Sequence, residues 1–254
     1  ECFTVSNWHL PVCGFDTRLS VMTYRQKRWT AFALPMILLV AVLAILTGLI
    51  KAEPAFYRQV SPPDTYDTRE KASHLVTRIQ DFKYEVRTRP AWGIRIGAEE
   101  LNCFFAEMMG PRGSFAGWLP SGFHSPRVAI VGDRLHLGVR YGQGWWSTVI
   151  SLQLRIWLVA EEINVVAVEV CDLRVGQLGI ARQSILDALS EAARASHIDV
   201  TWYRHGSNPV GLFRFFPDQP HPVSQILTLE VHDGNLTVAG RTRVEAVAPP
   251  PSKP

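Results

Sequence analysis

The strongest hydrophobic pattern in the chain is an apolar run close to its N-terminus. Positions 31–50, AFALPMILLVAVLAILTGLI, contain no charged residue. About twenty residues at 1.5 Å rise per residue make a helix about 30 Å long, the thickness of a bilayer's hydrocarbon core. A helix is required there because it closes its backbone hydrogen bonds within its own segment. The run predicts a single transmembrane helix over residues 31–50.

The charges around this run predict its direction. Arg25, Lys27 and Arg28 precede it, whereas Lys51 on the other side is followed by Glu53. Basic residues stay on the cytoplasmic side, so we expect a cytoplasmic tail over 1–30 and an extracytoplasmic domain. The alternative is a cleaved signal peptide, whose apolar region is about 7–15 residues long and precedes a small-x-small site.

The first residues and the segment after the run carry little pattern. Met22 is placed as a natural start would be, so residues 1–21 are expected either to precede the native start or to form a short tail. Three prolines in residues 51–66 predict an extended linker. The folded domain is expected over 67–245, and the proline-rich residues 246–254 are expected to form a loose tail.

Helical and strand periodicities alternate within 67–245. Apolar residues at helical spacing predict amphipathic helices over 68–83, 98–109 and 181–195, the first opened by a capping box from Asp67 to Glu70. Ile150, Leu152 and Leu154 alternate with polar residues, which indicates a strand with one buried face. Strands are predicted over 93–96, 128–131, 135–141, 145–159, 163–170, 198–204, 223–231 and 235–243, with tight turns at Gly132-Asp133 and Asp233-Gly234.

These elements predict an α+β fold. After the single N-terminal transmembrane helix we expect a curved antiparallel β-sheet domain packed on amphipathic helices, because a sheet with one apolar face must cover it. Hydrophobic residues make up 47% of the chain, which suits a packed body. The net charge of +3 comes without a basic stripe, so nucleic acid is not expected as a partner.

The sequence offers no set of catalytic or metal-binding residues. Zinc-protease, nucleophile-elbow, Walker and dinucleotide-binding motifs are absent, so we predict no enzyme activity, no cofactor and no metal. His205, His221 and Asp218 come nearest to a cluster and are interpreted as surface residues. Cys103 and Cys171 are expected to be separate thiols, although a disulfide between them stays open.

Two groups of large apolar residues are candidates for ligand binding. The helix over 98–109 opens with Glu99 and Glu100, which suit its positive end rather than catalysis. Its apolar face would either pack the core or line a hydrophobic lumen, and two tryptophans in a glycine-rich stretch would rim an entrance or touch lipid. The predicted ligand-binding residues are Leu101, Phe104, Phe105, Met108, Trp145 and Trp146.

The order of these features resembles that of the YpmS-like membrane-anchored proteins. The shared elements are the anchor, a helix with the motif Glu99-Glu100-Leu101-Asn102, long strands, a G-x-L-G-I stretch over 176–180 that leads into a helix, and a final strand pair. The chain more loosely resembles tubular lipid-binding domains, in which a curved sheet wraps a long helix. The resemblance covers about residues 90–243 and implies lipid-related roles in the cell envelope without catalysis.

The combined prediction is a membrane-anchored extracytoplasmic domain, not an enzyme, that binds a lipid or another apolar ligand. Its partners would be the bilayer, through residues 31–50, and a lipid ligand. The alternative is an interaction subunit of a membrane-associated complex, which would have no ligand cavity and would contact a membrane protein through strand edges or residues 209–217.

Overall fold

The computed structural model describes residues 24–63, 65–110, 113–115, 117–181, 183–215 and 223–243. Residues 1–21 and 246–254, together with His221 and Asp218 of the candidate cluster, lie outside these ranges. The chain divides into two compact units, Glu1–Ile45 and Leu46–Pro254. Among the described residues, the first unit contains the larger part of helix α1 (Tyr24–Lys51). Within the described residues, α1 is the helix that is long and apolar enough to cross a membrane, over Leu34–Lys51.

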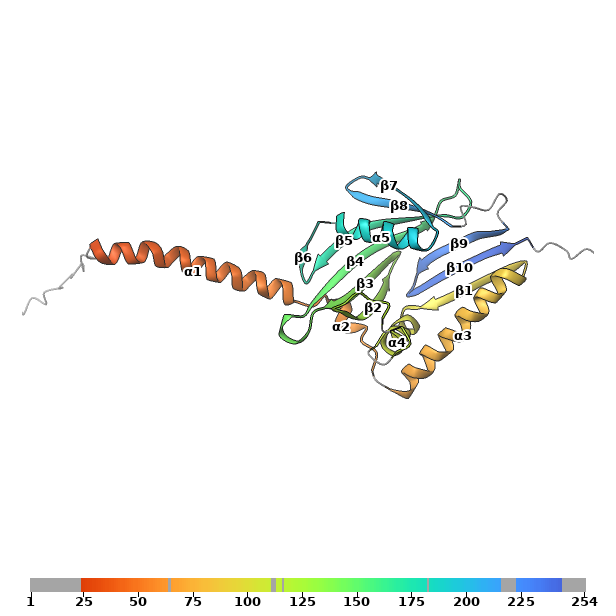
Figure 1. The fold of residues 1–254 in the computed structure, drawn as a ribbon, viewed down its shortest axis with the longest axis horizontal. Coiled ribbons are helices and arrows are strands. Elements are labelled where there is room, and N and C mark those ends of the chain that lie inside the picture. The colour runs from red at the N-terminus through yellow and green to blue at the C-terminus, as the bar shows by residue number, and fades with distance from the viewer. Residues whose placement is uncertain are drawn as a thin grey trace, which may run out of the picture. The chain divides into compact units, whose positions relative to one another are not determined.

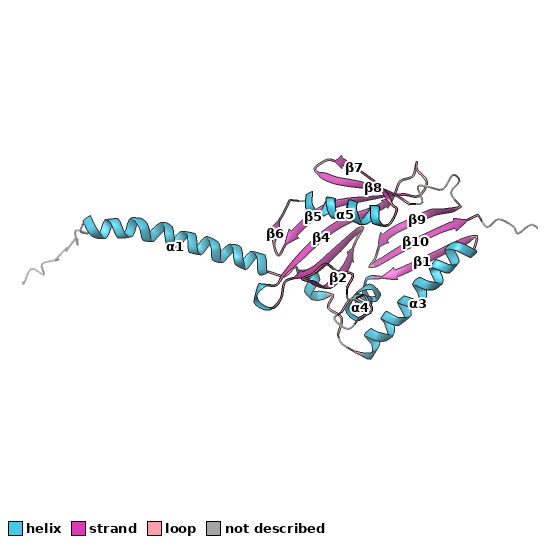
Figure 2. Ribbon diagram, viewed as in Figure 1, coloured by secondary structure: helices cyan, strands magenta, loops and turns pink. Residues whose placement is uncertain are grey.

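The second unit holds the remaining helices and all the strands of the described chain (Figures 1 and 2). The helices are α2 (Ala55–Gln59), α3 (Tyr66–Thr88), α4 (Ala98–Met108) and α5 (Gln183–Ala195), with a 3₁₀ turn η1 (Gly144–Trp146). The strands are β1 (Ala91–Gly97), β2 (Phe123–Val131), β3 (Arg134–Tyr141), β4 (Thr148–Leu158), β5 (Val165–Val175), β6 (Leu178–Gly179), β7 (Asp199–His205), β8 (Asn208–Arg214), β9 (Ser224–His232) and β10 (Asn235–Thr242).

The strands form two antiparallel sheets. The large sheet has the order β2-β3-β4-β5-β8-β7, with β6 paired to β5, and the small sheet has the order β1-β10-β9. The hairpin turns that join β2 to β3 and β9 to β10 lie at the two predicted positions. Positive φ at Gly132 in the first turn, and at Asp233 and Gly234 in the second, gives each turn a conformation that a two-residue hairpin uses. The predicted α+β class, with an apolar N-terminal helix and antiparallel pairing, is confirmed.

Helix α3 packs on β1 and β10 of the small sheet. The ring of Phe82 meets the buried Trp92 ring edge-on, 5.6 Å between centroids. The indole of Trp92 donates to the Thr242 hydroxyl at 2.8 Å, and that hydroxyl donates to the Val86 carbonyl at 2.7 Å. The helix begins at Tyr66 after Thr65, whose side chain makes no capping bond, so the predicted Asp67–Glu70 capping box is wrong.

Two buried asparagines close open strand edges. On α4, the Asn102 amide donates to the Val128 carbonyl at 2.7 Å and accepts from the Val128 N–H at 2.8 Å, so it pairs with the β2 edge as a strand would. After β4, Asn164 donates to the Ser224 carbonyl and accepts from the Ile226 N–H, both at 2.8 Å, on the β9 edge. Each amide thus satisfies backbone groups that an edge strand leaves unpaired.

Residues 51–66 do not form the extended linker that their prolines suggest. Helix α2 lies within them, and its Tyr57 is fully buried. A side chain at Gly138 of β3 would come within 2.6 Å of the Tyr57 ring, so glycine lets the ring pack against the large sheet. The prolines start and stop a short packed helix here.

Candidate functional site

The two faces of the large sheet differ in chemistry. Leu137 of β3 is directly opposite Val128 and Leu152, and Val139 is opposite Ile150, so these side chains share one face. We call this side the apolar face; its residues on β3 and β4 are Leu135, Leu137, Val139, Ile150, Leu152 and Leu154. The other face carries His136, Gly138 and Ser151, and α2 packs there.

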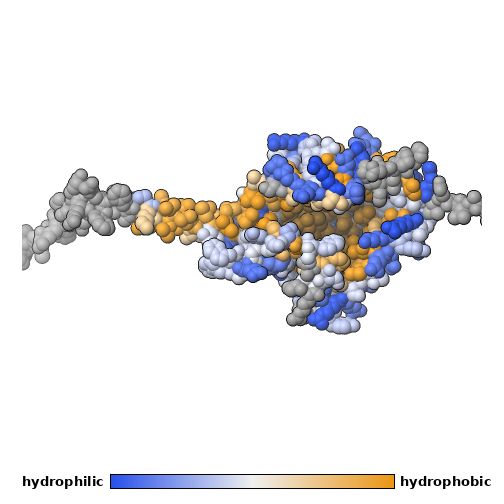
Figure 3. Space-filling view, viewed as in Figure 1, coloured by the Kyte–Doolittle hydropathy of each residue, from blue (hydrophilic) through white to orange (hydrophobic). Residues whose placement is uncertain are grey.

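The apolar face is incompletely covered. All of its β3 and β4 residues except Leu154 are only half-buried, although they lie on central strands of the sheet. Helix α5 covers part of this side, because Trp202, in register with Gly211 on β8, donates to Ser190 of α5 at 2.7 Å. Figure 3 shows apolar residues gathered in a recess in the middle of the domain, between α5 and the small sheet. Side chains of this size on central strands are usually fully buried.

A separate cleft of about 640 Å³ lies beside α4. Phe105, Met109 and Phe123 give it apolar walls, and His124 and Arg127 add polar ones. Gly144, next to Trp145, also borders it. The cleft therefore combines apolar and cationic groups on one surface.

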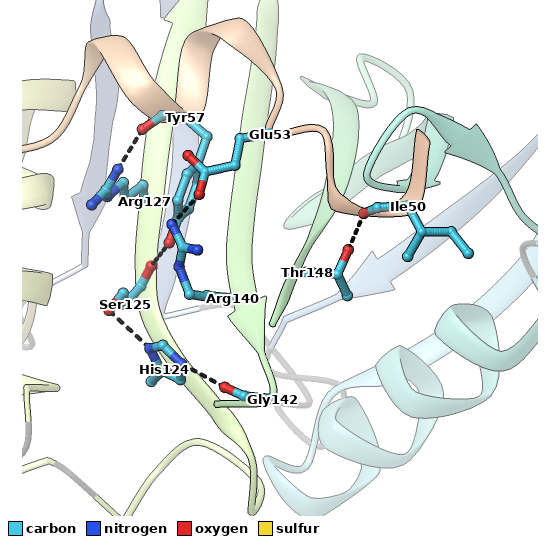
Figure 4. A network of polar contacts seen from close by, with 9 residues as sticks. All are labelled: Ile50, Glu53, Tyr57, His124, Ser125, Arg127, Arg140, Gly142 and Thr148. Carbon is cyan, nitrogen blue, oxygen red and sulfur yellow. Dashed lines mark hydrogen bonds and ion pairs between the residues drawn. The ribbon is translucent and has the colours of Figure 1, made fainter. Parts of the chain in front are cut away.

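A polar network fixes the cationic wall of this cleft (Figure 4). Arg127 donates to the Tyr57 carbonyl at 2.6 Å and lies 4.2 Å from the centre of the Tyr57 ring. The Tyr57 hydroxyl donates to the Ser125 carbonyl at 2.7 Å, and burial raises the pKa of this phenol. His124 bonds the Gly142 carbonyl at 2.9 Å. Since Tyr57 lies in the segment predicted as a linker, no sequence signal pointed to it.

The end of α1 is bonded to the same part of the domain. Thr148 donates to the Ile50 carbonyl at 2.5 Å, and the Gln177 N–H donates to the Leu49 carbonyl at 2.9 Å (Figure 4 shows the first). Gly176 has a φ of +61°, and a Cβ there would lie 2.2 Å from the Ile50 carbonyl oxygen. The start of β4 and the turn after β5 therefore hold the last turn of α1, and we call this contact the exit clamp.

The six predicted ligand-binding residues lie on two elements. Leu101, Phe104, Phe105 and Met108 are half-buried on α4, where Phe105 lines the α4 cleft. Phe104 packs against Phe115 at 6.0 Å between ring centroids. Trp145 and Trp146 lie on η1 and are exposed. The alternation of apolar and polar residues in the strands predicted which side chains form the apolar face. Nothing in the sequence predicted that part of this face would be left uncovered.

The first-turn carboxylates of α4 are engaged in ordinary ion pairs. Glu99 pairs with Lys71 at 2.7 Å, and Glu100 pairs with Arg78 at 2.6 Å while accepting the Gly97 N–H at 3.0 Å. This last bond is the carboxylate half of a capping box. The contacts account for both side chains structurally.

Among the described residues, no group of three His, Cys, Asp or Glu side chains is arranged to hold a metal. Burial raises the pKa of the Cys103 thiol and that of the Cys171 thiol. Comparisons with protein-family models, with curated proteins and with solved structures gave no match.

Proposed function

We propose that this chain is a single-pass membrane protein whose extracytoplasmic domain holds a lipid or another apolar ligand against the apolar face of the large sheet. The observation that supports this proposal most directly is the half-buried row of aliphatic side chains on central strands β3 and β4. A contiguous apolar surface of this kind is typical of a ligand groove or a docking site. The apolar segment of α1 supports residence in a membrane, where such ligands are abundant.

The remaining exposure of the apolar face limits how strongly that face could hold a ligand. Fully burying a Leu, Ile or Val side chain contributes about 1.5–3 kcal/mol. Each of the five half-buried side chains is exposed over at most about a third of its surface, so covering them would contribute at most about 5 kcal/mol before the costs of association. Alone, that corresponds to a dissociation constant no lower than about 0.2 mM, so the apolar face by itself would hold a lipid weakly and reversibly.

We also propose that the large sheet is curved and that it packs around the ligand. The face is flanked by α5 on one side and by β9, which contacts β2, β3 and β4, on the other. A ligand lying between them would complete the cover that the sheet lacks. The proposed orientation, with the domain outside the cytoplasm, rests on the basic residues that precede α1.

Lipid extraction from the purified full chain tests the proposal. The chain is purified in a mild detergent, its bound lipid is extracted with solvent, and the lipid is counted by mass spectrometry. Leu152→Trp fills the apolar face and is expected to lower the bound lipid several-fold. The matched control, Arg155→Trp, adds the same side chain at an exposed position of the same strand.

Wild-type protein and the Arg155→Trp variant should carry the same amount of lipid. Equal lipid in all three preparations would show that the apolar face is not the site. Absence of lipid from every preparation, together with a co-purifying membrane protein, would favour an interaction subunit instead.

A further inference from the structure

The turn that carries Trp145 and Trp146 lies at the point where the apolar segment of α1 ends. Thr148, two residues after the pair, bonds the Ile50 carbonyl in the exit clamp. The Lys51 ammonium lies 3.1 Å from the centre of the Trp145 ring and 5.9 Å from that of Trp146. Lys51 is also the first charged residue after the apolar run. Both indoles therefore lie beside the boundary between apolar and charged sequence.

Both indoles face outward from the domain. Trp145 is 73% exposed and Trp146 is 78% exposed, which is unusual for the largest apolar side chains. Tryptophan joins a broad apolar ring to one N–H donor, so it is stable where an apolar phase meets water, and it is enriched at membrane interfaces. A lysine beside the ring adds a charge that reaches lipid phosphates while its stem stays in the apolar phase.

The backbone presents this pair in a defined conformation. Gly142 has a φ of +89°, and a Cβ there would lie 2.4 Å from the Trp146 carbonyl oxygen. The Gly142 N–H donates to the Gly122 carbonyl at 2.9 Å, which ties the turn to the start of β2. Gly144, with a φ of +55°, opens the 3₁₀ turn that carries both rings. The glycines let the chain fold back so that two adjacent tryptophans project together.

We propose that Trp145 and Trp146, with Lys51, insert into the headgroup boundary of the bilayer that α1 spans. This inference rests on the proposed membrane anchoring and adds a second, peripheral contact between the domain and the lipid. It assigns the two tryptophans to the bilayer surface rather than to the ligand site. The exit clamp supports the bilayer as the partner of these tryptophans, because it holds their turn beside residues 49–51, where the apolar segment ends.

Quenching by brominated lipid tests the insertion. The full chain is reconstituted into phosphatidylcholine vesicles whose upper acyl carbons carry bromine, and vesicle flotation first reports whether it stays membrane-bound. Of the eight tryptophans, we expect Trp29, Trp145 and Trp146 to be quenched, since Trp29 precedes the other end of the apolar run. Trp145→Phe/Trp146→Phe should then lower the quenched signal about threefold, because interface-level indoles lie within reach of the bromines.

Trp157→Phe is the matched control. Trp157 is on the same strand as Thr148 and nine residues farther along, which places it about 30 Å away at 3.3 Å per residue. Its removal should leave the quenched signal unchanged. Equal quenching in wild type and the double variant, with both chains floating, would overturn the insertion and leave the anchoring intact. A chain that fails to float would overturn both, and shielding of the pair by a co-purified protein would assign the turn to that partner instead.

Discussion

Asn102 offers the sharpest test of how the domain is held together. Its side chain is 4% exposed and makes both bonds to Val128 as well as a 2.8 Å bond to the Ala98 carbonyl. Asn102→Leu keeps the branched shape of the side chain, in a somewhat larger volume, but removes all three bonds. The N–H and carbonyl of Val128 would then be buried on an open strand edge without partners, because leucine neither donates nor accepts.

The expected cost follows from those two backbone groups. A buried polar group left without a partner costs about 1–3 kcal/mol, so two groups cost about 2–6 kcal/mol. The apolar leucine recovers about 1 kcal/mol, which leaves a net loss of about 1–5 kcal/mol. At about 2–4 °C per kcal/mol for a domain of this size, Tm should fall by about 2–20 °C.

Urea unfolding of the full chain in detergent measures this loss. Intrinsic tryptophan fluorescence follows the domain, whereas far-ultraviolet circular dichroism would also report α1, which persists in micelles. Asn235→Leu is the control, since Asn235 makes one exposed bond to the Asp233 carbonyl and should change stability by no more than about 0.5 kcal/mol. Asn102→Asp refines the test because it places a carboxylate against the Val128 carbonyl. An Asn102→Leu variant within 1 kcal/mol of wild type would refute the edge pairing as a stabilising contact.

Three further outcomes are expected. Gly176→Ala should disrupt the exit clamp, because the new methyl group would collide with the Ile50 carbonyl. Trypsin should then cleave after Lys51 faster than it does in wild type. Gly179→Ala is the control, since a methyl group there meets no atom within 4 Å. Burial, and to a lesser extent Arg134, lowers the pKa of His136, so on acidification the unfolded state takes up a proton before the folded state does. The free energy of unfolding should therefore fall below about pH 6.5. Urea midpoints should show a less steep fall in His136→Gln than in wild type. Iodoacetamide should modify native Cys171 before Cys103, which is more deeply buried. Both reactions should be slow, because burial raises the pKa of each thiol. Peptide mapping that shows Cys103 modified first would contradict this order.

Periodicity predicted the elements of this chain well wherever the pattern was long. The alternation around Ile150 and Leu152 gave β4, and the helical spacing gave α3, α4 and α5 to within a few residues. Strand β8 was missed because its sequence contains Pro209 and Gly211, which normally interrupt strands. Pro209 lies just beyond the last β8 residue paired with β5, so its missing N–H is not required there. Gly211 leaves room for the Trp202 ring.

The candidate site was harder to predict than the strands. Which side of a strand is apolar follows from the alternation, but how completely other elements cover that side depends on long-range packing. The two asparagine clamps show the same limit: Asn102 and Asn164 look like ordinary polar residues in the sequence, and their roles depend on edges formed by residues about 26 and 60 positions away. Tyr57 was likewise hidden in a proline-rich segment.

The packed segment between α1 and α3 has a consequence for how far the domain can travel. Sixteen unfolded residues, 51–66, would let a tethered head wander about 20–24 Å on average. With α2 seated on the sheet and Leu49 and Ile50 clamped, that slack is absent. Residues 49–66 would therefore move as a part of the folded domain and not as a loose tether.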